Sequence, residues 1–239
     1  MSTNRPKISI VTPSFNQGPF IEQAIQSVLS QGYESFEHVI VDNCSTDETL
    51  DILRKYPHLI WVSEPDEGQS DAINKGFQLA SGEVIGWLNA DDYYLPNTFH
   101  SVAENLTEKY DGVYANVRFV DAAGKFMRNL TSHRPSKWLI LFYTFIQSTT
   151  FFFNRKVVDQ GIRIDKDFHL TMDREFFANL LFKNYRLKFV KEYYAAFRWQ
   201  GNNKSTPTPK VLAASLKENL IIINRYLGTS FTDHPFTIR

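Results

Sequence analysis

The residues best suited to chemistry in this chain lie where a short apolar run ends in polar side chains. Val84 to Leu88 is followed directly by Asn89-Ala90-Asp91-Asp92. Clustered oxygen ligands at the carboxyl end of a strand suit a hard divalent cation with a phosphate on its far side. A turn that is simply rich in Asp and Asn is the alternative explanation, so the rest of the chain must decide between the two.

Such ligands have to be positioned by regular elements, and the first 90 residues predict them. Apolar β-branched runs predict strands, and apolar positions spaced by three and four predict helices. The strands are expected at residues 7–12, 38–41, 59–63 and 83–88, and the helices at 20–31, 45–56 and 70–80. Ser45 and Glu48 have the spacing of a capping box for the second helix. This order predicts a parallel sheet with helices on both faces and binding groups at the carboxyl ends of the strands.

The loops expected at that edge are all polar. They are residues 13–19, 42–45, 64–70 and 89–94. The second half is less regular. Its expected elements are a helix at 96–109, a hairpin from strands 113–120 and 125–130, strands at 147–153 and 195–199, and helices at 170–183 and 210–226. We expect a single domain over residues 1–239, with its first half ending near residue 110.

Composition narrows the class of protein. Lys+Arg and Asp+Glu both total 26, so net charge is near zero and nucleic-acid binding by bulk electrostatics is not expected. Cys44 is the single cysteine, which excludes an internal disulfide. No apolar run is long enough for a membrane span and the first residues have no signal-peptide core, so we expect a cytoplasmic protein.

One apolar, aromatic segment, residues 138–143, leaves two interpretations open. Its sequence is WLILFY, and Arg134 and Lys137 flank it. Aromatic residues beside basic ones suit peripheral contact with the inner face of a membrane. The same run also suits a buried segment that closes the second half of the fold.

Five segments resemble glycosyltransferase family 2, in the family's order, from about residue 9 to residue 205. They read IVTPSFNQGPFIEQAIQSVLSQ, VDNCSTDETL, EPDEGQSDAINKGFQLASGEVIGWLNADD, QSTTFFFNRK and LTMDREFFANLL. The resemblance implies an α/β GT-A fold, in which a Rossmann-like, mostly parallel sheet is flanked by helices and joined by a smaller acceptor-side region. It implies metal-dependent transfer of a sugar, of the hexosyltransferase type, from a nucleotide-diphosphate sugar to an acceptor hydroxyl, with inversion. Residues 1–110 would then form the nucleotide-sugar half and residues 111–239 the acceptor half.

The resemblance also assigns donor-binding residues. Pro13 and Phe15 would lie against the nucleobase, and Asp42 would accept a hydrogen bond from a ring N–H or a ribose hydroxyl. Gln69 opens a helix whose free N–H groups favour phosphate. Ile73 stands where family members often have Arg, which leaves Lys75 as a candidate to neutralise the phosphates.

Metal and acid–base roles follow from the same resemblance. The family's Asp-x-Asp motif is Asn89-Ala90-Asp91 here, so Asp91 would be the charged ligand of Mn²⁺ or Mg²⁺, with Asn89 beside it. Asp173 would be the base that removes the acceptor proton, with Glu175 as the alternative. Since the two are two residues apart on a helix, only one should face the cleft. Residues 197–205 resemble a loop that closes over the donor, with Gln200 where the family often has His. Arg198 or Lys204 of this loop would meet the phosphates.

The expected partners are the nucleotide-diphosphate sugar donor and a glycan or lipid-linked glycan acceptor, in bacterial surface polysaccharide synthesis. Two other functions stay open. A non-catalytic nucleotide-sugar-binding module is compatible with Asn89 and Ile73 at positions where the family often has charged residues. A nucleotidyltransferase would need a Gly-rich, basic loop after the first strand, and residues 13–19 contain no Lys or Arg.

Overall fold

Strands and helices alternate through the first part of the computed structural model, which describes residues 5–201 and 203–232. The predicted order is confirmed over this part. Its elements are β1 (Ile8–Ser14), α1 (Gly18–Leu29), β2 (Phe36–Asp42), α2 (Thr49–Arg54), β3 (Leu59–Ser63), α3 (Gln69–Leu79) and β4 (Val84–Trp87).

The second half adds strands to the same sheet and helices beside it. Its elements are β5 (Tyr93–Tyr94), α4 (Thr98–Asn105), β6 (Gly112–Asp121), β7 (Phe126–Leu130), η1 (Leu139–Leu141), η2 (Ser148–Thr150), β8 (Phe152–Asn154), α5 (Lys156–Asp159), α6 (Met172–Phe182), β9 (Leu187–Trp199) and α7 (Pro209–Leu227). None of the helices in the described part of the chain is long and apolar enough to cross a membrane.

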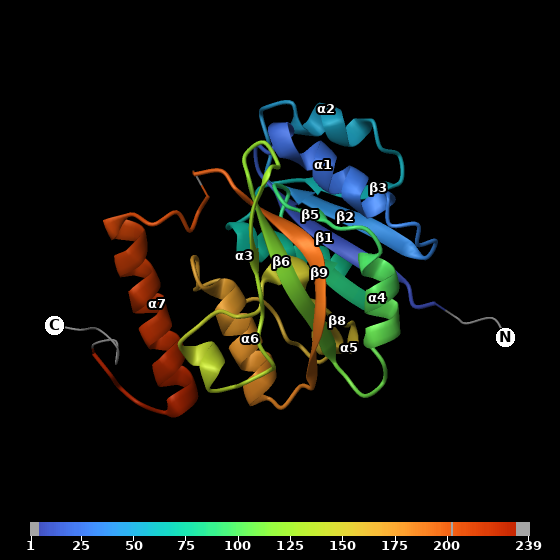
Figure 1. Ribbon diagram of the computed structural model, residues 1–239. Coiled ribbons are helices and arrows are strands. Elements are labelled where there is room, and N and C mark those ends of the chain that lie inside the picture. Colours follow the sequence, from blue (N-terminus) through green and yellow to red (C-terminus); the bar gives the residue numbers. More distant parts are fainter. Residues whose placement is uncertain (1–4, 202, 233–239) are drawn as a thin grey trace.

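Within residues 5–201 and 203–232, nine strands form one mixed sheet (Figure 1). The order is β3-β2-β1-β4-β8-β6-β9-β5, and β7 pairs with β6. β3, β2, β1 and β4 are parallel, and β8 runs antiparallel to both β4 and β6. The chain leaves β1 for β2 on one side and reaches β4 on the other, so a topological switch point lies beside β1. Ligands of open α/β sheets bind in the crevice at such a point, beyond the carboxyl ends of the strands.

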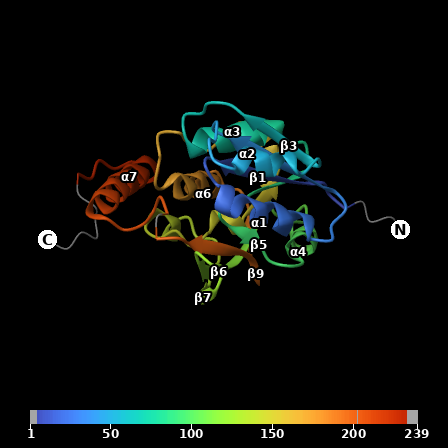
Figure 2. The same cartoon turned by 90° about the horizontal axis from the view of Figure 1, so that it is seen from above.

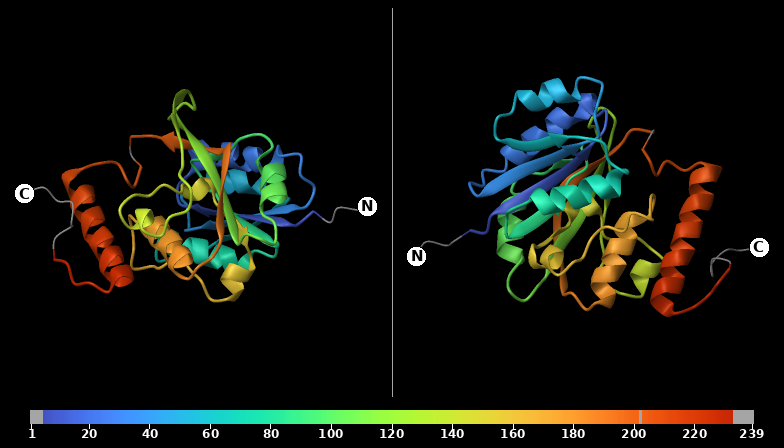
Figure 3. Two further views of the ribbon diagram at one scale, coloured as in Figure 1. Left: turned by 60° about the horizontal axis from the view of Figure 1, so that its bottom comes forward. Right: turned by 180° about the vertical axis from the view of Figure 1, so that it is seen from behind.

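The two faces of the sheet are covered by different helices (Figure 2). Side chains of a strand point alternately to opposite faces. Accordingly Val11 packs in one core cluster with α3 and α6, whereas Ile10 packs in another with α1 and α4. Figure 3 shows α3 lying across the face that Figure 1 hides, and α7 standing at the side of the molecule next to α6.

Two local predictions are wrong, both because side chains bind elsewhere. The capping box does not form: Ser45 Oγ donates to Asp42 Oδ1 (2.5 Å), and α2 begins only at Thr49. The strand expected at 147–153 is instead the 3-10 turn η2 followed by the short β8. There Thr150 Oγ1 lies 2.9 Å from the carbonyl oxygen of Gln147, a local bond that competes with extended structure.

Candidate active site

A cavity of about 670 Å³ opens at the carboxyl ends of β1 and β4, where the switch point predicts it. Both halves of the chain contribute to its wall. Six residues selected from the sequence line it, namely Pro13, Phe15, Gln69, Asn89, Asp91 and Asp173. Phe15 is 55% exposed, so its ring is open to a ligand rather than buried in the core.

Asn89 is held rigidly by its neighbours. Its Oδ1 accepts hydrogen bonds from Trp87 Nε1 (3.2 Å) and Gln69 Nε2 (3.0 Å), and its Nδ2 donates to Asp92 Oδ2 (3.1 Å). An amide oxygen has two lone pairs, and both are used here. The Asn89 oxygen is thus oriented toward protein donors, and its role as a metal ligand stays a prediction. Contact of Asn89 with the donor stays a prediction.

Asp91 is the acidic side chain of this loop that lines the cavity. Its Oδ2 accepts from Gln200 Nε2 (2.7 Å), the residue that stands where the family often has His. Burial raises the pKa of Asp91, and burial together with the charge of Asp91 raises the pKa of its buried neighbour Asp92 well above its ordinary value. Negative charge at this point is thus poorly compensated by the protein, which favours a cation beside Asp91.

Binding of a cation beside Asp91 would depend on ligands other than this carboxylate. Among the described residues, no group of three His, Cys, Asp or Glu side chains is arranged to hold a metal ion. Divalent Mg²⁺ commonly binds through one or two carboxylates plus substrate phosphates and water. The single carboxylate of Asp91 fits a site of that kind.

Arg198 does not line the cavity, contrary to the expectation that it meets the phosphates. It is only 3% exposed, and its guanidinium donates to the backbone carbonyls of Asp91 (2.9 Å) and Ala122 (2.7 Å) and to Gln23. Its backbone N–H also donates to Asp92 Oδ1 (2.9 Å). Arg198 therefore stabilises the loop that carries Asp91 through its hydrogen bonds to Asp91 and Asp92.

Asp42 is likewise turned inward. It is fully buried, and its Oδ2 accepts from the backbone N–H of Ser45 (2.9 Å) and from Ser63 Oγ (2.7 Å). These bonds shape the loop after β2, and the neighbouring Asn43 lines the cavity in place of Asp42. Asp42 therefore does not line the cavity, and its contact with the donor stays a prediction.

Asn43 and Asp66 are cavity residues that sequence reasoning missed. Asn43 Oδ1 accepts from the backbone N–H of Asp66 (3.0 Å), so the loops after β2 and β3 are joined. A signal was available, because both residues follow neighbouring parallel strands in loops already identified as polar. Burial raises the pKa of Asp66.

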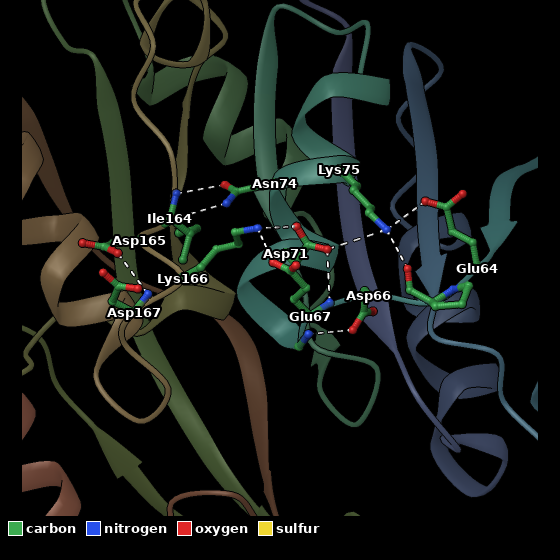
Figure 4. Close-up of polar contacts among 12 residues, drawn as sticks. Glu64, Asp66, Glu67, Asp71, Asn74, Lys75, Ile164, Asp165, Lys166 and Asp167 are labelled. Atoms are coloured by element: carbon green, nitrogen blue, oxygen red, sulfur yellow. Dashed lines mark hydrogen bonds and ion pairs between the residues drawn. The ribbon is translucent and has the colours of Figure 1, made fainter.

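Lys75 does not line the cavity and belongs instead to an ion-pair network (Figure 4). Its Nζ lies 2.8 Å from Glu64 Oε1 and 3.6 Å from Asp71 Oδ2. The cation that lines the cavity is Lys204, whose Nζ donates to Gln69 Oε1 (3.4 Å). Ile73, at the position where the family often has Arg, is fully buried in the core. Lys204 therefore replaces Lys75 as the candidate for phosphate contact.

Helix α6 separates the two candidate bases, as its periodicity predicts. Asp173 lines the cavity, and its Oδ1 accepts from the backbone N–H of Arg174 (2.7 Å). Glu175 is 2% exposed and turned away: its Oε1 accepts from Arg225 Nη1 (2.8 Å) and Tyr226 Oη (2.7 Å). Burial raises the pKa of Asp173, an effect opposed by Arg174 and Lys204. Only Asp173 can therefore reach a ligand in the cavity.

Aromatic side chains form a further part of the wall that no motif predicted. Phe119 and Phe197 lie with ring centroids 4.9 Å apart, and Trp199 lines the cavity beside them. They come from β6 and β9, which are adjacent only in the folded sheet. Aromatic faces of this kind provide large apolar contact area for a ligand.

A known protein family matches the part of the chain that carries most of this cavity. The model of the family described as Glycosyl transferase family 2 matches residues 9–181, which is more than half of the chain. The chain belongs to glycosyl transferase family 2. The matched segment includes β1 to β4 and Asp173, so the cavity described above lies largely within the family's common part.

Solved structures establish the fold of this family member as GT-A. S. aureus TarS 1-349 in complex with UDP superposes with a TM-score of 0.70 at 20% identity, covering 91% of this chain and 65% of that one. The mannosyltransferase PcManGT from Pyrobaculum calidifontis, in complex with GDP-Man and Mn²⁺, gives a TM-score of 0.67 at 18% identity and covers 98% and 68% of the two chains. The predicted α/β, mostly parallel sheet flanked by helices is confirmed.

Relatives in sequence align with about half of this family 2 chain. TuaG of Bacillus subtilis (strain 168), a glycosyltransferase named for teichuronic acid biosynthesis, is 34% identical over 115 residues, which are 46% of this chain and 45% of TuaG. A glycosyltransferase of Nostoc sp. (strain PCC 7120 / SAG 25.82 / UTEX 2576) is 32% identical over 135 residues, 54% of this chain and 42% of the relative. The chain thus spans less than half the length of each.

Proposed function

We propose that this chain transfers a sugar from a nucleotide-diphosphate sugar to an acceptor hydroxyl, with inversion at the anomeric carbon. The observation behind the proposal is that Asp91 and Asp173, two carboxylates from opposite halves of the chain, line one cavity with the exposed Phe15. One carboxylate suits metal-assisted binding of a diphosphate, and the other suits proton removal. Inverting transfer needs both functions in one site.

The donor would lie along the carboxyl edge of the sheet. Pro13 and Phe15 would contact the base, with Asn43 and Asp66 as neighbouring polar groups. Gln69, at the start of α3, and Lys204 would lie near the diphosphate, where free N–H groups and a positive charge favour phosphate. When bound at Asp91, Mn²⁺ or Mg²⁺ supplies positive charge that stabilises the departing diphosphate. The Mn²⁺ and GDP-Man of PcManGT support this part of the proposal.

On the acceptor side, Asp173 would accept the proton of the attacking hydroxyl. Its raised pKa favours proton acceptance more than that of an exposed Asp. The Phe119, Phe197 and Trp199 wall would contact apolar ring faces of the substrates. The name of TuaG supports an acceptor in bacterial surface polysaccharide synthesis, a glycan or lipid-linked glycan.

A screen by thermal shift tests donor binding. We expect one of the UDP-, GDP- or dTDP-sugars to raise the melting temperature, and to do so more strongly with Mn²⁺, because a ligand that binds only the native state stabilises it by mass action. UDP-GlcNAc and GDP-mannose come first, since structural relatives were solved with them. CMP-sugars, which carry one phosphate, are screened for contrast. No shift with any of the three diphosphate sugars, with or without Mn²⁺, would contradict the proposed donor class.

A non-catalytic nucleotide-sugar-binding module remains the second candidate, favoured by the neutral, pinned Asn89. Mn²⁺-dependent hydrolysis of the donor that the screen selects separates the two. The enzyme releases free sugar slowly when water replaces the acceptor. A binding module gives the thermal shift with no hydrolysis.

For a lipid-linked acceptor, we propose contact between residues 137–143 and an anionic membrane surface. The structure divides this segment: Ile140 and Leu141 are fully buried, whereas Trp138 is 58% and Tyr143 42% exposed. Lys137 Nζ lies 5.3 Å from the Trp138 ring, so a basic group accompanies the exposed aromatic one. The buried part fits a segment that closes the second half of the fold, and the exposed part supports the proposed membrane contact.

Flotation with anionic liposomes tests this contact. We expect the wild type to float, and Trp138→Ala and Lys137→Glu to float less, since aromatic insertion and charge attraction both decrease. Phe126→Ala is the matched control, because Phe126 is 57% exposed on β7 away from this segment. A wild type that stays at the bottom of the gradient, or a control that weakens binding equally, rejects the contact.

A further inference from the structure

Helix α7 lies outside the part of the chain that the family model matches, yet it contacts the helix that carries Asp173. The match ends at residue 181, and α7 begins at Pro209. Figure 1 shows α7 beside α6 at one side of the molecule. What α7 contributes to the site is therefore a property of this chain rather than of the family's common part.

The segment just before α6 is bound by the carboxylate of Glu218 on α7. Its Oε2 accepts from the backbone N–H groups of Leu170 (2.9 Å) and Thr171 (2.8 Å) and from Thr171 Oγ1 (2.9 Å), and its Oε1 accepts from the backbone N–H of His169 (3.0 Å). Three consecutive backbone donors thus converge on one side chain. These residues immediately precede α6, so Glu218 fixes the segment that leads into Asp173.

Glu218 binds the backbone N–H groups that immediately precede the first turn of α6. Thr171 occupies the N-cap position, but its side chain caps no N–H of the helix. Of the N–H groups at this end, Glu218 takes those of residues 169–171 and Asp173 Oδ1 takes that of Arg174. Since the Arg174 N–H engages Oδ1 of Asp173, Oδ2 is the oxygen that would face a ligand. Without Glu218, the Asp173 carboxylate could turn toward the N–H groups of residues 169–171 and accept hydrogen bonds from them.

Two neighbouring groups connect α7 further to Asp173. Arg174 Nη1 donates to Asn219 Oδ1 (2.6 Å) on α7, next to Glu218. Lys204, which lines the cavity, is influenced electrostatically by both Glu218 and Asp173. The charged and titratable groups around Asp173 are thus Arg174 on its own helix, Lys204 and His169 in the cavity wall, and Glu218 behind them.

We infer that Glu218 is a positioning residue, which holds residues 169–171 so that Asp173 presents one carboxylate oxygen to the acceptor hydroxyl. The inference rests on the proposed function of Asp173. It follows that α7 completes the acceptor side of the site rather than only covering the core.

The test compares Glu218→Gln with Tyr226→Phe, using hydrolysis of UDP-GlcNAc or GDP-mannose, whichever the thermal-shift screen retains. Gln keeps the size of Glu218 but replaces one acceptor oxygen with a donor that cannot pair with an N–H. Tyr226→Phe removes a bond at the other end of the same helix. We expect Glu218→Gln to lower kcat by roughly 10- to 100-fold through misplacement, with donor KM within about twofold, and Tyr226→Phe to change neither.

Two readouts distinguish positioning from a loss of stability. Because Glu218 holds the segment that leads into Asp173, the acid limb of the pH–rate profile should change position in Glu218→Gln and stay in place in Tyr226→Phe. Hydrogen exchange should become faster in the peptide that covers residues 169–172 only when Glu218 is changed. If Glu218→Gln does not fold, Thr171→Val removes the hydroxyl contact alone and should show the same effects at smaller size.

Asp173→Asn, measured in parallel, separates failure of this inference from failure of the proposed function. The inference alone is overturned if Asp173→Asn is inactive while Glu218→Gln keeps the wild-type kcat and the wild-type position of the acid limb. A fully active Asp173→Asn overturns the proposed base and the inference together.

Discussion

Asp173→Asn is expected to lower turnover by roughly 10²–10⁴-fold, while donor binding is retained. The substitution keeps the shape of the side chain but removes its capacity to accept a proton. Asp173 is not among the groups proposed to hold the donor, so the thermal shift with nucleotide sugar and Mn²⁺ should stay close to that of the wild type. Steady-state transfer or hydrolysis rates and the thermal-shift titration together check both parts.

The pH dependence of the wild-type rate provides a second test of Asp173. A base is active when ionised, so the rate falls as the pH drops through its pKa. Because burial raises the pKa of Asp173, the acid limb should lie above the ordinary Asp range near about 3.9 and should disappear from the residual activity of Asp173→Asn.

Glu175→Gln is the matched control for this prediction, since it changes a carboxylate two residues away. Glu175 is buried against Arg225 and Tyr226, so the variant should have a lower melting temperature but near-normal turnover when folded. If Glu175→Gln is folded but inactive and Asp173→Asn is active, the base is Glu175, and the assignment to Asp173 is wrong.

Asp91→Ala is expected to remove the part of donor binding that depends on metal, at least about tenfold in Kd, or about 1.4 kcal/mol. Asp91 is the charged group that the cavity offers to a cation, and Asn89 has its oxygen occupied by Trp87 and Gln69. Without the carboxylate, a cation has too few protein ligands at this point. Calorimetric titration of the nucleotide with and without Mn²⁺ measures the difference.

A second acidic substitution controls for the loss of charge. Glu67 is exposed and pairs with Lys166 at the surface, so Glu67→Ala removes a carboxylate from the same side of the molecule without touching the cavity wall. We expect this control to retain the effect of Mn²⁺, and Asp91→Ala to keep its melting temperature without ligand. Equal nucleotide affinity of wild type and Asp91→Ala in Mn²⁺ would remove Asp91 from the metal site.

Local sequence pattern predicted the donor half of the fold well. The strand–helix alternation up to Trp87 is governed by apolar periodicity, which each segment carries in its own residues. Parallel strands require crossovers, so their carboxyl ends, and the polar loops there, could be placed at one edge without coordinates. Pro13, Phe15, Gln69, Asn89 and Asp91 were found in this way or by resemblance, and they line the cavity.

Direction of a polar side chain was predictable only where the helix itself decides it. Asp173 and Glu175 are two residues apart, and the geometry of a helix sends them to different faces whatever surrounds them. Asp42 and Arg198 had no such constraint. Each could face the cavity or an internal partner, and those partners, Ser63 and Gln23, come from distant parts of the chain.

The sequence by itself determined the parallel sheet, the edge that binds and the separation of the two candidate bases, because periodicity and strand direction are local properties. The tertiary structure decided that the side chains of Asp42, Lys75 and Arg198 bind other protein groups and do not line the cavity. It also decided that Asn43, Asp66 and Lys204 line the cavity, and that Glu218 reaches α6 from α7. These outcomes depend on which donors and acceptors meet across long sequence separations, since a buried polar group binds the partner that folding brings to it.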